Sequence, residues 1–480
     1  MRVLRSATTT RRAAPRLSSL SSTAALGFAA LGISPALSPA VARLGFTDPT
    51  PVQQQTFAKA LEGKDMVVLA ETGSGKTLAY SLPIVQMMLR EAEDGAGLDD
   101  GGGAPPPERP QALLLQPNRE LCSQVRGVLD GLVRDLDMSV SSLVDDDANC
   151  DADVLISTPA VALRSWRGPE RVRWLVLDEA DMLLAGSFKP AARSQYPVEQ
   201  IIAALKRDGQ QQASAEGAGR VAGHLRGDER RLQKAALYQR SKQFLLVGAT
   251  MPNAGTRNIE NYVTRQFPGA VWVRTDGAHR KRDGLRQFFV KVDPAQRDAA
   301  LRHAVVHGPP GRALVFANTL ASAEDAHAAL LEGAGELAPP PSGLFHKDVP
   351  REERAALLAA FAAGDVQVLV CTGLASRGID FADVAHVVQY DMASNAVEFM
   401  HRIGRTARAG KPGATTCLYA DGSEADLAET LRDAVEQGKP IDHVFSRKRS
   451  FRKGVKRYGR PGLTQTQKQA RNPGARRSER

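Results

Sequence analysis

Short apolar runs alternate with longer amphipathic stretches along most of the chain. The first half contains five runs, at 66–70, 112–115, 154–156, 172–177 and 244–247. The second half contains five more, at 288–292, 313–316, 366–371, 386–390 and 414–419. Strands that are apolar throughout are buried on both faces, which is typical of parallel sheets covered by helices. The pattern predicts an α/β fold with two tandem parallel-sheet domains.

The spacing of these runs also predicts the domain boundaries. We expect folded structure from Phe28, with a first domain over 28–274 and a second over 285–440. The residues between them, 275–284, would form a linker.

Three further segments carry local signals. A helix is expected over 33–45, because Ser34 suits an N-cap and Pro35 the first helical position. The stretch 94–110 is rich in Gly and Pro, and 206–231 is polar with few large apolar side chains. We expect both stretches to be flexible surface inserts.

The positive charge is concentrated at the two ends of the chain. The formal net charge is +10, yet residues 1–47 contain six Arg and no Lys, Asp or Glu, and residues 441–480 contain thirteen Lys and Arg against two acids. The body between them is therefore acidic. The Arg- and Ser-rich start at 1–27 is typical of an organellar transit peptide. Its Arg content favours a mitochondrion over a plastid, with the nucleus or nucleolus as the alternative if it is not cleaved.

Cysteine usage argues against a zinc site or a disulfide scaffold, and hydropathy argues against a membrane span. The four cysteines are scattered without a zinc-binding spacing or a disulfide framework, which fits a reducing compartment. The uncharged stretch 17–42 consists mostly of small residues and contains Pro35 and Pro39, so we expect no membrane span.

The run 66–70 leads into a glycine-rich turn and then a helix. Such a loop lets backbone N–H groups surround phosphates at a helix N-terminus, while Lys76 neutralises the terminal phosphates and Thr77 can bind Mg²⁺. A chance structural turn is the alternative. The predicted ATP-binding residues here are Ala70, Glu71, Thr72, Gly73, Ser74, Gly75, Lys76 and Thr77.

An acidic turn, Asp178-Glu179-Ala180-Asp181, follows the run 172–177. A carboxylate at the end of a strand beside a phosphate loop can hold Mg²⁺, so we assign Asp178 this role, through a water molecule. Glu179 is then placed to polarise the attacking water. By itself, an acidic turn after a strand would be an ordinary solvated turn.

These motifs resemble those of the DEAD-box RNA helicases, and the acidic turn is the motif that names the family. The resemblance covers about 28–442, with the motifs in family order. It implies two RecA-like domains with a cleft for ATP and RNA between them. It also implies that Phe28, Phe46 and Gln53, around the segment 45–53, contact the adenine.

The resemblance assigns two further motifs in the second domain. The segment 372–380 is similar to the motif that contacts both RNA and nucleotide, which implies RNA contacts for Thr372, Arg377 and Gly378 and a nucleotide contact for Asp380. The segment 401–408 is similar to the arginine-finger motif. It implies catalytic roles for Arg405 and Arg408, which would reach the γ-phosphate, and coupling roles for His401 and Arg402.

In this family ATP is hydrolysed when RNA closes the cleft, and closure bends one RNA strand so that a short duplex opens locally. The resemblance therefore implies ATP and Mg²⁺ as cofactors and RNA as partner. By analogy we expect ribosomal RNA or a ribonucleoprotein, a monomer, and activating protein cofactors. The basic tail 441–480, with Phe451 and Tyr458 among its cations, suits RNA capture; a solubility tail or a nuclear localisation signal is the alternative.

Several motif positions depart from the family pattern. Pro117-Asn118-Arg119 and Thr158-Pro159 keep RNA-binding positions, but Ala160-Val161 lacks a cation and 145–147 is Asp-Asp-Asp where the family has a Gly-Gly contact. Among the coupling residues, Asp181, Ala249 and Thr250 are present, whereas Gly248 lacks the usual serine hydroxyl. We therefore expect RNA-stimulated ATPase activity with weakened unwinding. The alternatives are an ATP-gated RNA clamp or scaffold with slow turnover and, less in keeping with the motifs, a DNA-translocating helicase.

Overall fold

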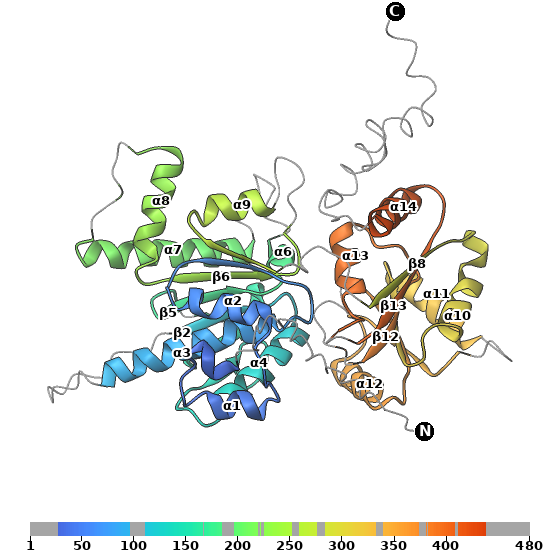
Figure 1. The fold of residues 1–480 in the computed structure, drawn as a ribbon, viewed down its shortest axis with the longest axis horizontal. Helices are drawn as coiled ribbons and strands as arrows, with labels where there is room; N and C mark the ends of the chain where they lie inside the picture. Colours follow the sequence, from blue (N-terminus) through green and yellow to red (C-terminus); the bar gives the residue numbers. More distant parts are fainter. Residues whose placement is uncertain are drawn as a thin grey trace, which may run out of the picture.

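The computed structural model describes two α/β domains, each built on a parallel sheet flanked by helices (Figure 1). The residues it describes are 27–96, 111–166, 168–184, 196–218, 221, 225–251, 259–275, 284–332, 339–373, 381, 383–408 and 411–437. The expected fold of two tandem parallel-sheet domains is confirmed. The transit segment and the basic tail lie outside the described residues, as do most of the linker and of the 94–110 insert.

Domain 1 contains a seven-stranded sheet in the order β3-β4-β2-β5-β6-β1-β7. All of its pairings are parallel, and β1 runs between β6 and β7. Its strands are β1 Met66–Leu69, β2 Gln111–Leu115, β3 Val140–Ser142, β4 Val154–Ser157, β5 Val172–Leu177, β6 Gln243–Gly248 and β7 Val271–Arg274. Because β1 and β5 lie on either side of β6, the ends of the two strands that carry the phosphate loop and the acidic turn lie at one edge of the sheet.

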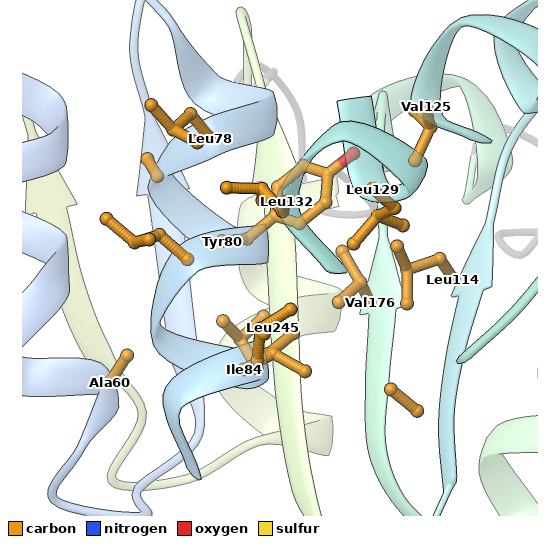
Figure 2. Close-up of a cluster of buried hydrophobic side chains, with 14 of the residues drawn as sticks. Ala60, Leu78, Tyr80, Ile84, Leu114, Val125, Leu129, Leu132, Val176 and Leu245 are labelled. Atoms are coloured by element: carbon orange, nitrogen blue, oxygen red, sulfur yellow. The ribbon is translucent and has the colours of Figure 1, made fainter. Parts of the chain in front are cut away.

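Helices cover both faces of this sheet. They are η1 Phe28–Leu31, α1 Ser38–Arg43, α2 Pro51–Ala60, α3 Lys76–Ala96, α4 Arg119–Val133, α5 Pro159–Ser165, α6 Ala180–Leu183, α7 Pro197–Ala215, α8 Gly227–Tyr238 and α9 Ile259–Gln266. On one face, Tyr80 and Ile84 of α3 and Leu129 of α4 pack over Leu114 and Val176 of the sheet (Figure 2). Residues of α7, α8 and α9 fill a second core on the other face.

Domain 2 contains a six-stranded parallel sheet in the order β10-β11-β9-β12-β13-β8. Its strands are β8 Leu285–Lys291, β9 Arg312–Ala317, β10 Ser342–Phe345, β11 Val368–Thr372, β12 Val384–Gln389 and β13 Gly413–Tyr419. Its helices are η3 Pro294–Gln296, α10 Arg297–Val306, α11 Leu320–Leu331, α12 Arg351–Ala363, α13 Ala396–Ile403 and α14 Ser423–Glu436. Along β9, Val315 faces one buried cluster and Phe316 the other, so the central strand is apolar on both faces.

The ten apolar runs all form strands, and three strands were not predicted. These are β3, β7 and β10, whose sequences are Val-Ser-Ser, Val-Trp-Val-Arg and Ser-Gly-Leu-Phe. Each is only three or four residues long, and each carries polar or glycine residues because it lies at or near a sheet edge. Such strands lack the continuous apolar signal of central strands.

Two expectations about local structure are wrong. The polar stretch 206–231 is helical over 206–215, within α7, and over 227–231, within α8. Gly209 explains how: a Cβ there would lie 2.9 Å from Lys242 Cγ and 3.0 Å from Tyr238 Cβ, so the small residue lets α7 lie close to α8. At the N-terminus, Pro35 lies in a turn, and α1 begins at Ser38 rather than at Pro35.

None of the helices in the described part of the chain combines the length and the apolar character that crossing a bilayer would need. All four cysteines are free thiols, and only Cys150 is not fully buried.

Candidate active site at the cleft between the domains

The phosphate loop connects β1 to α3. Gly73 and Gly75 have left-handed backbones, with φ of 77° and 87°, a conformation in which glycine has no Cβ penalty. Lys76 is the first residue of the 21-residue α3, and its Nζ donates to the Ala70 and Glu71 carbonyls at 3.0 and 2.9 Å. The predicted loop therefore has the local shape of a phosphate cradle, with its lysine folded over the loop.

Gln53 joins the segment assigned to the adenine to this loop. Its Oε1 accepts from the Thr50 amide at 2.8 Å, which closes a capping box at the start of α2, and its Nε2 donates to the Gly75 carbonyl at 3.1 Å. The side chain is only 3% exposed. Of the two predicted aromatic contacts, Phe28 is buried in the first core and Phe46 is exposed.

Asp178 directly follows β5, and its carboxylate is buried. Its Oδ2 accepts from the Tyr80 hydroxyl at 3.0 Å, and its Oδ1 accepts from the Glu179 amide at 2.9 Å. Burial and then repulsion from Glu179 raise the pKa of Asp178 to about 6, although Lys76 opposes this. Sequence reasoning missed Tyr80, whose hydroxyl is the only feature that distinguishes it from an ordinary core aromatic residue.

Glu179 adopts a left-handed backbone, with φ 48° and ψ 50°, at the position before α6. This conformation costs a non-glycine residue about 1–2 kcal/mol, and such residues cluster at functional sites. Its carboxylate is buried, Oε2 accepts no hydrogen bond from the residues that the structure describes, and His401 Nδ1 of domain 2 lies 3.6 Å from it. The turn thus directs Oε2 of Glu179 toward domain 2.

Asp181 is the centre of a network that crosses the cleft. The Thr250 hydroxyl donates to its Oδ2, and His401 Nε2 of α13 lies 3.0 Å from the same oxygen. Figure 1 shows α13 on the side of domain 2 that faces α6. Burial alone would raise the pKa of Asp181, but the His401 charge and both hydrogen bonds outweigh it, so the pKa is lowered. Burial likewise opposes protonation of His401, but Asp181 and Glu179 raise its pKa overall.

The arginine-finger segment lies against the phosphate loop. The Thr72 hydroxyl donates to the Gly404 carbonyl at 3.1 Å, and a Cβ on Gly404 would collide with that hydroxyl. A Cβ on Gly73 would lie 3.3 Å from Arg408 Cγ. Arg408 Nε donates to the Gly404 carbonyl at 2.9 Å, and Arg405 Nε donates to the His401 carbonyl at 3.2 Å. Both arginines predicted to act on phosphate are therefore brought to the phosphate loop side of the cleft.

Comparison with known proteins agrees with this geometry. Residues 50–258 match the DEAD/DEAH box helicase family and residues 296–410 match the helicase conserved C-terminal domain. The DEAD-box ATP-dependent RNA helicase 22 of Arabidopsis thaliana is 34% identical over 89% of this chain and 83% of its own length. The protein of the same name from Oryza sativa subsp. japonica is 33% identical over the same shares.

The chain belongs to the DEAD-box family of ATP-dependent RNA helicases. As such it is an RNA-stimulated ATP hydrolase that binds RNA. The structure of S. cerevisiae Dbp5 bound to RNA and ADP BeF3 has the same two-domain fold, with a TM-score of 0.64 and 22% identity, covering 86% of this chain and 94% of Dbp5.

In this DEAD-box protein two further residues assigned to coupling, Arg402 and Ala249, are both buried. Arg402 is 2% exposed and bonds to residues of domain 2: it donates to Glu398 Oε1 at 2.6 Å, to Asn318 Oδ1 at 2.7 Å and to the Asp391 carbonyl at 2.8 Å. It thereby anchors α13, which carries His401. Ala249 is buried beside the network.

Gly248 ends β6 next to Asp181. A Cβ at Gly248 would lie 3.4 Å from the Thr250 carbonyl oxygen and 3.7 Å from Asp181 Oδ1. These are ordinary van der Waals distances, so the site has room for a serine whose hydroxyl would approach the Asp181 carboxylate. The missing hydroxyl therefore leaves this DEAD-box network one polar group short.

The RNA-side residues of domain 1 mostly shape the local backbone. Asn118, which follows Pro117, caps α4 by accepting from the Leu121 amide at 2.8 Å, and Arg119 donates to the Val144 carbonyl at 2.7 Å. Thr158 precedes α5, which Pro159 begins, and Thr372 ends β11. Arg377, Gly378 and Asp380 lie outside the described residues.

The acidic segment 145–147 is bound by arginines from both domains. Asp145 Oδ2 accepts from Arg126 Nη1 at 2.8 Å, while Arg351 Nη2 of α12 lies 3.6 Å from Asp145 Oδ1. On α4, Glu120 also pairs with Arg354 of α12, at 3.3 Å. The sequence predicts that the carboxylates of 145–147 repel RNA phosphates, and the ion pair from Arg351 partly neutralises this charge. Sequence reasoning missed all three arginines because their partners are far away in the chain.

Proposed function

We propose that this DEAD-box helicase hydrolyses ATP when RNA draws the two domains together, and that closure remodels short RNA duplexes or ribonucleoproteins. The observation that carries the proposal is that the groups for ATP chemistry are divided between the domains and touch across the cleft. Lys76 and Asp178 lie on domain 1, whereas Arg405 and Arg408 lie on domain 2, in the turn that follows α13. A site divided in this way is complete only in the closed state.

The donor set near the phosphate loop suits Mg²⁺. Asp178 offers a buried carboxylate and Thr77 a hydroxyl, both hard oxygen ligands, and the two side chains face the same Tyr80 hydroxyl. We assign the binding of Mg²⁺ to Thr77 and, through water, to Asp178. When bound, the ion supplies charge neutralisation for the ATP phosphates.

The chain's own residues divide the remaining work. Lys76 binds the terminal phosphates, and the buried Oε2 of Glu179 accepts a proton from the attacking water as it orients that water. Arg405 and Arg408 stabilise negative charge on the transferred phosphoryl group, which guanidinium groups do well because they stay charged and bind oxygen pairs. His401 and Asp181 join the domains while this happens.

A second candidate, an ATP-gated RNA clamp with weak unwinding, is supported by separate observations. Gly248 lacks a hydroxyl beside Asp181, and the ion pairs of Arg351 and Arg354 join the domains at positions where RNA phosphates would otherwise be bound. The missing hydroxyl favours weak coupling of hydrolysis to unwinding, and the ion pairs favour a closed state that depends less on RNA.

The biological setting is proposed from the ends of the chain. The Arg-rich segment 1–27 supports import into an organelle, with the mitochondrion favoured over the plastid and the nucleus or nucleolus as the alternative. The basic tail 441–480 supports RNA capture. We propose a monomer that acts on ribosomal RNA or its precursors, assisted by activating proteins. Crosslinking to RNA in isolated organelles, followed by sequencing of the bound RNA, tests this setting.

The central experiment measures ATP turnover and strand separation with and without RNA, for the wild type and Glu179→Gln. A helicase shows RNA-stimulated turnover that Glu179→Gln abolishes, and it separates a short duplex. RNA retention with ATP but without RNA-stimulated turnover would favour the clamp instead.

A further inference from the structure

Tyr80 lies in the second turn of α3 and is fully buried. Its ring packs in the core between α3, α4 and the sheet (Figure 2). Its hydroxyl, in contrast to the ring, contacts a polar group and donates to Asp178 Oδ2 at 3.0 Å. The bond joins the helix that follows the phosphate loop to the strand that ends in the acidic turn.

The hydroxyl is surrounded by polar groups of the nucleotide site. The side chains of Thr77 and Gln116 face it as well as Asp178, and Gln116 lies at the end of β2 and is itself fully buried. A phenol is protonated at neutral pH, so the Tyr80 hydroxyl is a donor to the Asp178 carboxylate. Core packing by itself accounts for the ring but not for a hydroxyl at this place.

The orientation of the Asp178 carboxylate depends on two donors. The Glu179 amide holds Oδ1 at 2.9 Å, and the Tyr80 hydroxyl holds Oδ2. Loss of the second donor would leave a buried carboxylate oxygen unsatisfied and free to rotate toward another partner. Groups that orient a metal-binding carboxylate usually contribute tenfold or more to metal affinity.

We propose that Tyr80 is a positioning residue for Mg²⁺-nucleotide binding. Its hydroxyl holds the Asp178 carboxylate in the orientation that faces Thr77. This inference rests on the proposed assignment of Mg²⁺ to Thr77 and Asp178. It concerns a residue that does not touch the nucleotide and that acts only through Asp178.

The test uses Tyr80→Phe in the full-length chain, with a fluorescent ADP analogue as probe and MgCl₂ as the titrant. We expect the Mg²⁺ concentration for half-maximal nucleotide binding to rise about tenfold. Binding in EDTA should equal that of the wild type, and saturating Mg²⁺ should restore it. A mere folding defect would lower nucleotide binding at every Mg²⁺ concentration, so that pattern overturns the proposal.

Tyr390→Phe is the matched control, because the Tyr390 hydroxyl also donates to an aspartate, Asp298 Oδ1 at 2.6 Å, but in domain 2. It should leave the Mg²⁺ titration unchanged. In an Asp178→Asn background, Tyr80→Phe should add no further Mg²⁺ effect; an equal added effect there would also overturn the proposal. If nucleotide binding by the wild type does not depend on Mg²⁺, the proposed metal site fails. If the wild type depends on Mg²⁺ and Tyr80→Phe gives the same titration, only the role of Tyr80 is rejected.

Discussion

Asp145 of domain 1 and Arg351 of domain 2 face each other across the cleft, with Oδ1 and Nη2 3.6 Å apart. Neither side chain belongs to the ATP site, yet the pair joins the two halves of the protein on the side assigned to RNA. Glu120 and Arg354 form a second such pair at 3.3 Å. Contact between the two domains therefore includes charge pairing, and RNA phosphates, which are also anionic, can compete for these arginines.

Reversing one charge of this pair should weaken closure. Because Arg351 is largely exposed, the pair contributes only about 0.2–1 kcal/mol, so we expect Arg351→Glu to lower RNA-independent closure about twofold. Fluorescence energy transfer between dyes on the two domains measures this. The double reversal Asp145→Arg with Arg351→Glu should restore closure, and failure to do so would show that the two side chains act separately.

Gly248→Ser should improve the coupling of ATP hydrolysis to unwinding. The site accommodates a Cβ at 3.7 Å from Asp181 Oδ1, so the new hydroxyl can join the network around Asp181. We expect more duplex separated per ATP hydrolysed, with RNA-stimulated turnover nearly unchanged. Gly248→Ala is the control for the added Cβ, and equal unwinding by the wild type and the serine variant would remove the coupling argument.

Gly404→Ala should block closure without harming ATP binding to domain 1. Its Cβ would meet the Thr72 hydroxyl, which now donates to the Gly404 carbonyl. A displacement of about 1 Å in a catalytic arrangement commonly costs about 100-fold in rate, so we expect kcat to fall by that order. Nucleotide affinity in the absence of RNA is the internal control. Turnover at the wild-type rate would mean that hydrolysis does not need this approach of the two segments.

Closure should weaken as the pH rises above neutrality. His401 faces Asp181 and Glu179 of domain 1 and Arg405 of its own domain, and its pKa is raised in the closed state. A raised histidine pKa stabilises the closed state fully below the ordinary value of about 6.5, and this contribution is lost as the pH rises through the raised pKa. The lowered pKa of Asp181 means that its own contribution is present above the ordinary aspartate value of about 3.9 and is lost as the pH falls below it.

Affinity for RNA in the presence of a non-hydrolysable ATP analogue, measured from pH 6 to 9 at constant salt, tests this dependence. We expect affinity to decline across that range in the wild type. His401→Gln keeps a hydrogen-bonding side chain but cannot titrate, so its profile should be flatter. Identical profiles would assign the pH dependence to other groups.

Deleting 446–480 should lower RNA affinity and reduce the dependence of that affinity on salt. The segment is rich in Lys and Arg, and each phosphate neutralised adds to the slope of log affinity against log salt. Measurements at several salt concentrations on one single-stranded RNA test this. An unchanged slope would reject the capture role of the tail.

Local chemistry determined much of this protein. Gly73 and Gly75, between a strand and Lys76, permit the left-handed backbone of a phosphate loop, because glycine adopts these angles without strain. Continuous apolar runs likewise determine buried parallel strands, since such segments need cover on both faces. For the same reason the two domains and the order of their motifs could be predicted from residues near one another in the chain.

Only the tertiary structure decided which distant side chains meet. Asp181 and His401 are 220 residues apart, and nothing in either local sequence requires the 3.0 Å contact between them. The role of Tyr80 depends on α3 packing beside β5, and the partners of Asp145 depend on where α12 lies. Within 206–231, Gly209 of α7 lets that helix pack closely against Tyr238 of α8, a contact that neither local sequence specifies. Packing between segments, rather than propensity within them, supplied these contacts.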